Sequence, residues 1–166
     1  EISNMLWSFA LYFSINYTEI TKPDIQTLKN ILEHFHQEFL IEDIMEAQFQ
    51  KYQFLLIAEK ILEKDVKYLQ KIKTLKETII IEQSETTPSF FQKEVIQIIR
   101  QICEEEVIEE YHYEPFYFDI YISSKNMIIE VDGPMHFSQI DGRTAFGKTI
   151  LRNFIYANCF LNLYVV

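Results

Sequence analysis

The chain has 166 residues, 48% of them apolar, which is enough for one or two small domains and too much for a disordered protein. Its two cysteines cannot make a disulfide framework or a zinc site, and no apolar stretch is long enough to cross a bilayer, so no membrane partner is expected. The net charge of −10 is uneven, because residues 1–110 hold 11 Lys and Arg against 20 Asp and Glu, whereas residues 111–166 hold 4 against 5. The acidic part is therefore expected to face neighbouring proteins, and the second part is the better nucleic-acid candidate.

Residues 1–82 are predicted to be helical. A compact apolar segment covers 4–15, a second helix starts at the cap residue Thr21, and apolar residues at helical spacing continue as one long segment over 42–76. The β-branched run 78–81 could form a short strand. The polar, turn-rich stretch that ends at residue 88 separates a helical region, 1–87, from a second domain, 88–166.

The second domain is predicted to be a small α/β unit. Ser89 and Gln92 form a capping box that opens a helix reaching about residue 110. The period then changes from 3.6 to 2, which predicts strands over 116–122 and 127–132, joined as a hairpin. A helix over 145–158 and a strand over 160–166 follow. The predicted fold class is α+β, a helical region followed by this α/β domain.

The glycines are concentrated in one short window. Gly133, Gly142 and Gly147 are the only three in the chain. Glycine serves where the backbone takes positive φ or approaches something closely, so unusual backbone geometry is expected there.

The hairpin implies a carboxylate cluster. With the turn centred on Ser124 and Lys125, Asp119 faces Glu130, and Asp132 lies two residues further on the same sheet face. Such a cluster is stable if a cation such as Mg²⁺ bridges the acids, if a proton is shared, or if Lys or Arg enters from elsewhere. The structural alternative is a one-residue register slip, with Asp132 only a turn residue.

Basic residues follow the hairpin. Arg143 and Thr144 precede the predicted helix, and Lys148 and Arg152 share one of its faces. At a helix start this set is suited to a phosphate contact. Pairing with the hairpin carboxylates is at least as frequent for such residues, and His136 is more often a packed histidine than a catalyst.

Taken together, these residues resemble the RAP domain, a family named for its abundance in apicomplexan parasites. The similarity covers about residues 89–166, and its specific part is the stretch Ile-Glu-Val-Asp-Gly-Pro-Met-His-Phe over 129–137. The positions that fall on the family's pattern are Asp119, Glu130, Asp132, Gly133, Pro134, His136, Gly142, Thr144, Lys148 and Arg152.

The resemblance implies a restriction-endonuclease-like α/β fold and RNA binding in mitochondria, or alternatively in plastids. Family members act in organellar RNA processing, stability and ribosome assembly, usually behind helical repeats that dock partners. The implied RNA is organellar rRNA or mRNA, and the implied RNA-binding residues are Gly133, His136, Arg143, Thr144, Lys148 and Arg152.

Three functions follow from these observations. The first is RNA binding without catalysis in an organellar ribonucleoprotein such as the mitochondrial ribosome. It is favoured because restriction-type nucleases carry Glu-x-Lys, whereas here Asp132 takes the lysine position. The second is a metal-dependent endoribonuclease with Asp119 and Glu130 holding Mg²⁺ and Lys148 replacing the lysine. The third is a purely structural subunit.

Overall fold

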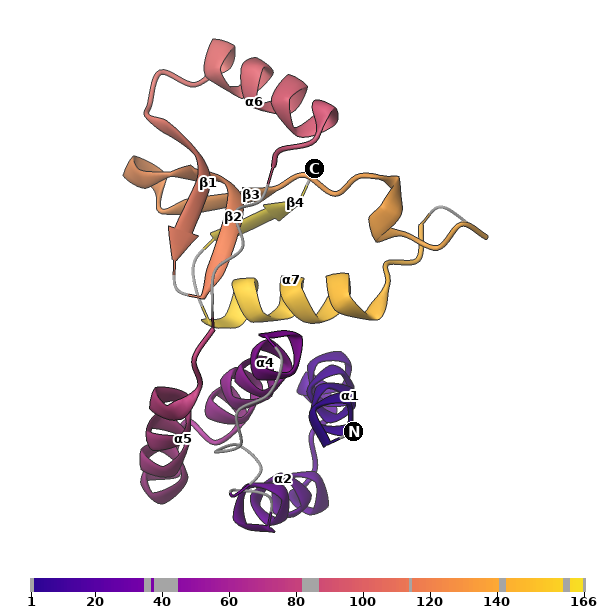
Figure 1. The fold of residues 1–166 in the computed structure, drawn as a ribbon, viewed down its shortest axis with the longest axis vertical. Helices are drawn as coiled ribbons and strands as arrows, with labels where there is room; N and C mark the ends of the chain where they lie inside the picture. Colours follow the sequence, from indigo (N-terminus) through magenta and orange to yellow (C-terminus); the bar gives the residue numbers. More distant parts are fainter. Residues whose placement is uncertain are drawn as a thin grey trace. The chain divides into compact units, whose positions relative to one another are not determined.

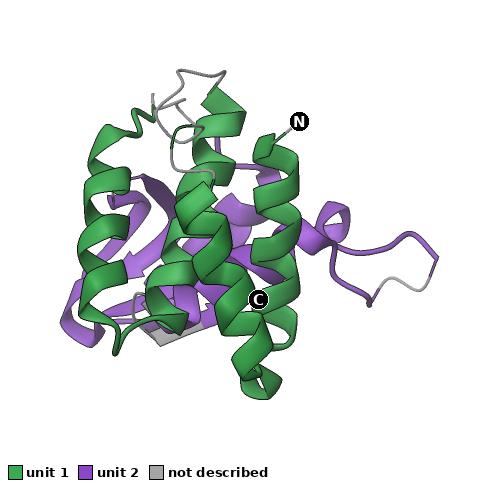
Figure 2. Cartoon of the chain, turned by 90° about the horizontal axis from the view of Figure 1, so that it is seen from below, with its two compact units in different colours: residues 1–82 green, residues 83–166 purple. Residues whose placement is uncertain are grey.

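The structure is a computed structural model that describes residues 2–34, 37, 45–81, 87–113, 115–140, 143–159 and 162–165. The chain divides into two compact units, Glu1–Glu82 and Gln83–Val166 (Figure 2). The first unit consists of helices, and the second combines helices with a sheet. The fold class is therefore α+β with the helices first, as predicted.

The first unit is a helical assembly around an apolar core. α1 packs against α4, and α4 packs against α5. Leu6, Ala10 and Phe13 of α1 and Phe54 and Leu55 of α4 are almost completely buried. The elements of this unit are α1 (Ile2–Ile15), the short 3₁₀ helix η1 (Tyr17–Glu19), α2 (Lys22–His34), α4 (Met45–Ile61) and α5 (Val66–Thr78).

Two details of this unit differ from the prediction. The single helix predicted over 42–76 is wrong within the described residues, because a turn between Ile61 and Val66 separates α4 from α5. No glycine or proline marks that turn, and Lys29 of α2 pairs with its Asp65 at 2.6 Å, so tertiary contacts stabilise it. The strand predicted over 78–81 is also wrong, since α5 continues to Thr78 and the next three residues have no regular structure.

The second unit is a four-stranded mixed sheet between two helices (Figure 1). The strand order is β1-β2-β3-β4, with β1, β2 and β3 antiparallel and β4 parallel to β3. α6 and α7 lie on opposite sides of the sheet (Figure 1). The elements of this unit are α6 (Phe90–Ile102), β1 (Val107–Tyr113), β2 (Phe116–Ile122), η2 (Ser123–Lys125), β3 (Met127–Glu130), η3 (Pro134–His136), α7 (Gly147–Cys159) and β4 (Asn162–Val165).

α6 begins as predicted and ends earlier. The capping box is confirmed: the Ser89 hydroxyl accepts from the Gln92 N–H at 3.1 Å, and the Gln92 side chain accepts from the Ser89 N–H at 2.5 Å. The predicted extension to residue 110 is wrong, because α6 ends at Ile102 and β1 starts at Val107. The acidic run therefore lies beyond the helix and on a strand, where it does not oppose the helix dipole.

The hairpin register is the predicted one. Ile120 pairs with Ile129, and Ile122 pairs with Met127. The turn between them contains η2 and ends at Asn126, whose φ of 50° is in the left-handed region that asparagine tolerates. β3 is two residues shorter than predicted, so Asp132 follows the strand.

β2 alternates between buried and half-buried residues, as predicted, but its buried residues contact two different helices. Ile120 and Ile122 pack with Ile96 of α6. Phe116 and Phe118 instead lie edge-on to Tyr156 of α7, at centroid distances of 5.5 and 4.7 Å. Asp119 is the residue between these two groups and therefore lies near both helices.

β1 has its own irregularity at the same level of the sheet. Its Glu110 has a positive φ of 45° and lies between the pairs Glu109–Ile120 and Tyr111–Phe118, and therefore opposite Asp119. β1 thus departs from regular strand geometry opposite Asp119, whereas β2 keeps its alternation of burial there.

Candidate functional site

Asp119 connects three elements of the second unit. Its Oδ1 accepts from Gln92 Nε2 of α6 at 2.6 Å, and its Oδ2 accepts from the Val131 N–H after β3 at 2.7 Å. Burial raises the pKa of Asp119, although these two hydrogen bonds and Arg152 oppose the rise. Both carboxylate oxygens are therefore used by the fold.

Glu130 and Asp132 are buried together around one arginine. Their side chains are 4% and 2% exposed. Arg152 of α7 places Nη1 3.2 Å from Glu130 Oε2 and Nη2 2.6 Å from Asp132 Oδ1. The sequence left three ways to stabilise these acids: a bridging cation, a shared proton or a basic side chain from another element. The structure contains a basic side chain, Arg152 of α7, between them.

The acids also influence each other. Burial, and after it the neighbouring Asp119 carboxylate, raises the pKa of Glu130 to about 8, against the opposing effect of Arg152. Burial lowers the pKa of Arg152, but Glu130 and Asp132 raise it by more, so its net change is upward. At neutral pH the group thus combines a mostly protonated Glu130 with an ionised arginine. Glu130 Oε1 and Asp132 Oδ2 are buried without a hydrogen-bond partner.

The donor set does not fit a magnesium ion. Mg²⁺ requires several oxygens free to converge on it in octahedral geometry. Asp119 has both oxygens occupied by protein donors, and the arginine lies against Glu130 and Asp132. In the part of the chain that the structure describes, no group of three His, Cys, Asp or Glu side chains could hold a metal ion.

His136 extends this group toward the surface. Its Nδ1 lies 3.0 Å from Asp132 Oδ1 and 3.4 Å from the hydroxyl of Thr149, which is buried in α7. Its backbone is also held, because the His136 N–H donates to Gly133 O at 3.0 Å and its carbonyl accepts from the Phe146 N–H at 3.0 Å. The ring is 32% exposed. The result is a continuous chain from Glu130 through Arg152 and Asp132 to a partly exposed imidazole.

Gly133 does not have the strained backbone that its residue type suggested. Its φ is −68°, so the expectation of unusual geometry is wrong at this position. A Cβ added here would have no atom within 4 Å, so internal packing does not require glycine either. Gly147 is the first residue of α7, and Gly142 lies outside the described residues.

The predicted basic residues fall into two groups. Arg152 is mostly buried and paired with the acids. Arg143, Thr144 and Lys148 are exposed around the start of α7, where the Thr144 carbonyl accepts from the Ser138 N–H at 2.7 Å. Lys148 makes no ion pair with any described residue, so its charge faces solvent and it is not joined to Asp119 or Glu130.

Two residues of the site were not assigned a role there from the sequence. Gln92 was identified only as a helix cap, yet its side chain also donates to Asp119. Thr149 was not singled out, although it is 2% exposed and contacts His136. The local sequence carries no signal for this role, because Thr149 lies between Lys148 and Ile150 and its partner His136 is 13 residues away.

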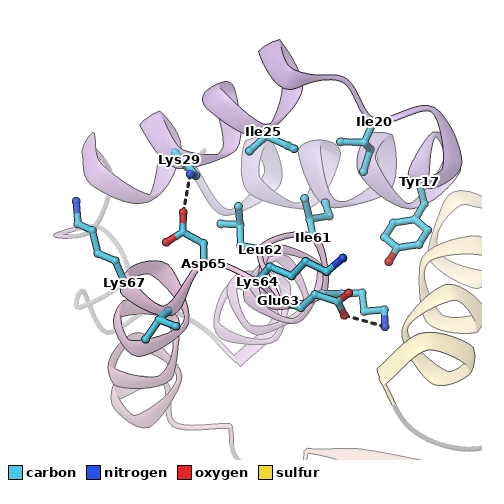
Figure 3. A pocket seen from close by; sticks show the side chains of 12 residues that line it. Tyr17, Ile20, Ile25, Lys29, Ile61, Leu62, Glu63, Lys64, Asp65 and Lys67 are labelled. Atoms are coloured by element: carbon cyan, nitrogen blue, oxygen red, sulfur yellow. Dashed lines mark hydrogen bonds and ion pairs between the residues drawn. The ribbon is translucent and has the colours of Figure 1, made fainter.

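The first unit has a hollow of its own. An open pocket of about 710 Å³ lies beside α2 and the turn between α4 and α5 (Figure 3). Its lysines are largely neutralised locally: Lys29 pairs with Asp65, and Lys60 pairs with Glu63. It contains none of the predicted site residues. No helix in the described ranges combines the length and apolar character of a bilayer-spanning segment.

The comparisons with known proteins give no independent identification. The chain matches no protein-family model and no curated protein.

Proposed function

We propose that this chain is an RNA-binding protein of RAP-domain type in a mitochondrial ribonucleoprotein, and that its second unit contacts the RNA without cleaving it. Mitochondrial rRNA or mRNA is the proposed ligand, and the acidic helical unit docks neighbouring proteins. The supporting observation is the division of charge around Arg152. The acids face inward onto this arginine, while Lys148 presents its charge to solvent.

The local charge favours an anionic ligand. Residues 133–152 contain three Lys and Arg and one Asp, in a chain whose net charge is −10. The exposed members, Arg143 and Lys148, lie at the start of α7, where backbone N–H groups and the helix dipole also favour anions. A phosphate can approach Gly133 closely, since no side chain covers it. A polynucleotide crossing this region would meet all of these features in succession.

The absence of cleavage is proposed on the same geometry. A restriction-type nuclease needs a lysine two residues after the glutamate, and Asp132 is at that position. Arg152 lies where a metal ion would have to bridge the acids. Lys148 does not reach Glu130, so it does not replace the missing lysine in this arrangement.

Fluorescence anisotropy with a labelled single-stranded RNA tests this proposal. Removing one phosphate-binding charge should reduce the salt dependence of log K by about 0.7. Lys148→Glu is expected to weaken binding by about tenfold, equivalent to about 1.4 kcal/mol. Lys93→Glu is the matched control, because Lys93 is an exposed lysine on α6, on the other side of the sheet, and its reversal changes the net charge equally.

The other two functions are outcomes of the same experiment. Binding that is equally weakened by both reversals, or absent altogether, would favour a structural subunit. Mg²⁺-dependent shortening of the RNA that disappears in Asp119→Ala would establish the endoribonuclease instead.

A further inference from the structure

We propose that His136 recognises the ribose, with its Nε2 accepting a hydrogen bond from a 2′-hydroxyl group, so that the site selects RNA over DNA. This inference rests on the proposed RNA-binding function and names the chemical group of the RNA, the ribose 2′-hydroxyl, that the protein recognises.

The protonation of the ring follows from Asp132. A carboxylate beside a guanidinium is an acceptor, and Asp132 Oδ1 lies 2.6 Å from Arg152 Nη2 and 3.0 Å from His136 Nδ1. The Nδ1 atom must therefore carry the proton that it donates to Asp132. In a neutral imidazole the other nitrogen, Nε2, then has a free lone pair and acts as an acceptor.

No part of the described protein uses this acceptor. The side-chain contacts of His136 with Asp132 and Thr149 both involve Nδ1, and among the described residues none forms a hydrogen bond with Nε2. The ring is nevertheless held in place, because its Nδ1 contacts Asp132 and Thr149 and the His136 backbone is bonded to Gly133 and Phe146. A fixed ring with one free acceptor loses little freedom when it binds a donor.

The surroundings fit a nucleotide better than a protein side chain. Gly133 is on the same 3₁₀ turn and leaves open space above its Cα. The exposed Lys148 precedes Thr149, the residue that contacts His136, in the first turn of α7. A ribose and its phosphate offer the matching pair of groups, a hydroxyl donor for the imidazole and an anion for the lysine. The 2′-hydroxyl is the group by which proteins distinguish RNA from DNA.

Three oligonucleotides of one sequence test the inference on the full chain. These are RNA, DNA and 2′-O-methyl RNA, which keeps the RNA sugar shape but cannot donate from the 2′ position. The chain is expected to bind RNA about five- to tenfold more tightly than the other two, the size of one net hydrogen bond. His136→Phe should lower RNA affinity to the level of 2′-O-methyl RNA and leave the affinity for DNA within about twofold. His34→Phe, at an exposed histidine of α2, is the control and should change neither ratio.

A second measurement avoids any substitution. Imidazole nitrogen NMR of the unmodified chain should show a protonated Nδ1 and an unprotonated Nε2 for His136, with the Nε2 signal moving on addition of RNA but not of 2′-O-methyl RNA. A proton on Nε2 instead, or equal affinity for RNA and 2′-O-methyl RNA, would overturn the inference. Equal affinity for the two oligonucleotides would leave RNA binding, and with it the proposed function, in place. No binding of RNA by the unmodified chain would overturn both the proposed function and this inference.

Discussion

Replacing Arg152 tests the central feature of the site. The substitution Arg152→Met keeps most of the side-chain volume and removes the charge that faces Glu130 and Asp132. At pH 7 Glu130, with its pKa raised to about 8, is mostly protonated, so the charge left uncompensated is that of Asp132. The Asp132 side chain is 2% exposed, and water therefore cannot replace the arginine.

The expected loss is large. Removing one partner of a buried ion pair costs about 3–5 kcal/mol, because the other charge remains buried alone. Adding Asp132→Asn removes that charge and should recover most of the loss, which a double-mutant cycle measures.

Urea unfolding of the full chain is the assay, with a probe for each unit. Trp7, the single tryptophan, lies in α1 and reports on the first unit by fluorescence. The sheet tyrosines report on the second unit by near-UV circular dichroism, since Tyr111 and Tyr121 stack at 4.2 Å.

Arg100→Met is the control for this assay, because it removes a surface pair with Glu109 in which the Arg100 side chain is 51% exposed. Such a pair should contribute at most about 1 kcal/mol. The reasoning is refuted if Arg152→Met costs no more than the control, or if Asp132→Asn adds a further loss in the Arg152→Met background.

Three other outcomes follow from the structure. Because the pKa of Glu130 is raised from 4.5 to about 8, the folded state keeps a proton between these pH values that the unfolded state has released. The free energy of unfolding should therefore fall as the pH rises from 4.5 to about 8, and urea unfolding of Glu130→Gln should show a flatter pH profile. Gly133→Ala should leave the melting temperature unchanged or slightly raised, since its Cβ meets nothing, yet weaken RNA binding in the anisotropy assay; unchanged affinity would show that the open space is not used. Ser89→Ala should cost about 1 kcal/mol because it removes a helix cap, and Gln92→Ala should cost more because it also removes the donor to Asp119; equal urea midpoints would contradict that second role.

The hairpin register was predictable because local chemistry determines it. The polar four-residue stretch between the alternating segment 116–122 and the apolar run that follows it leaves one centre for the turn. That centre fixes every pair, including Ile120 with Ile129. The capping box at Ser89 was predictable for the same reason, since all of its partners lie within three residues.

The elements that were missed depend on contacts distant in sequence. β1 was missed because glutamates precede it and interrupt it at Glu109 and Glu110, which hides the strand preference of its valine, isoleucine and tyrosines. Its pairing with β2 makes it a strand. The break between α4 and α5 likewise lacks glycine or proline and is supported by Lys29 from another helix. Neither partner can be identified from a local window of sequence.

Arg152 is a residue whose role depends on such a contact between positions distant in sequence. From the sequence, a phosphate contact and a pair with the acids were both open, because Arg152 is 20 residues from Asp132 along the chain. The structure contains the pair with the acids. If Arg152 left this pair to bind a phosphate, Asp132 would remain buried without a compensating charge, as in the Arg152→Met substitution. An ion pair between Arg152 and a phosphate on the surface would stabilise the complex by much less than this cost, because water screens the contact. Any RNA contact on this side of the unit therefore falls to the groups that leave the buried chain intact, namely Lys148, Arg143, the uncovered Gly133 and the outer nitrogen of His136.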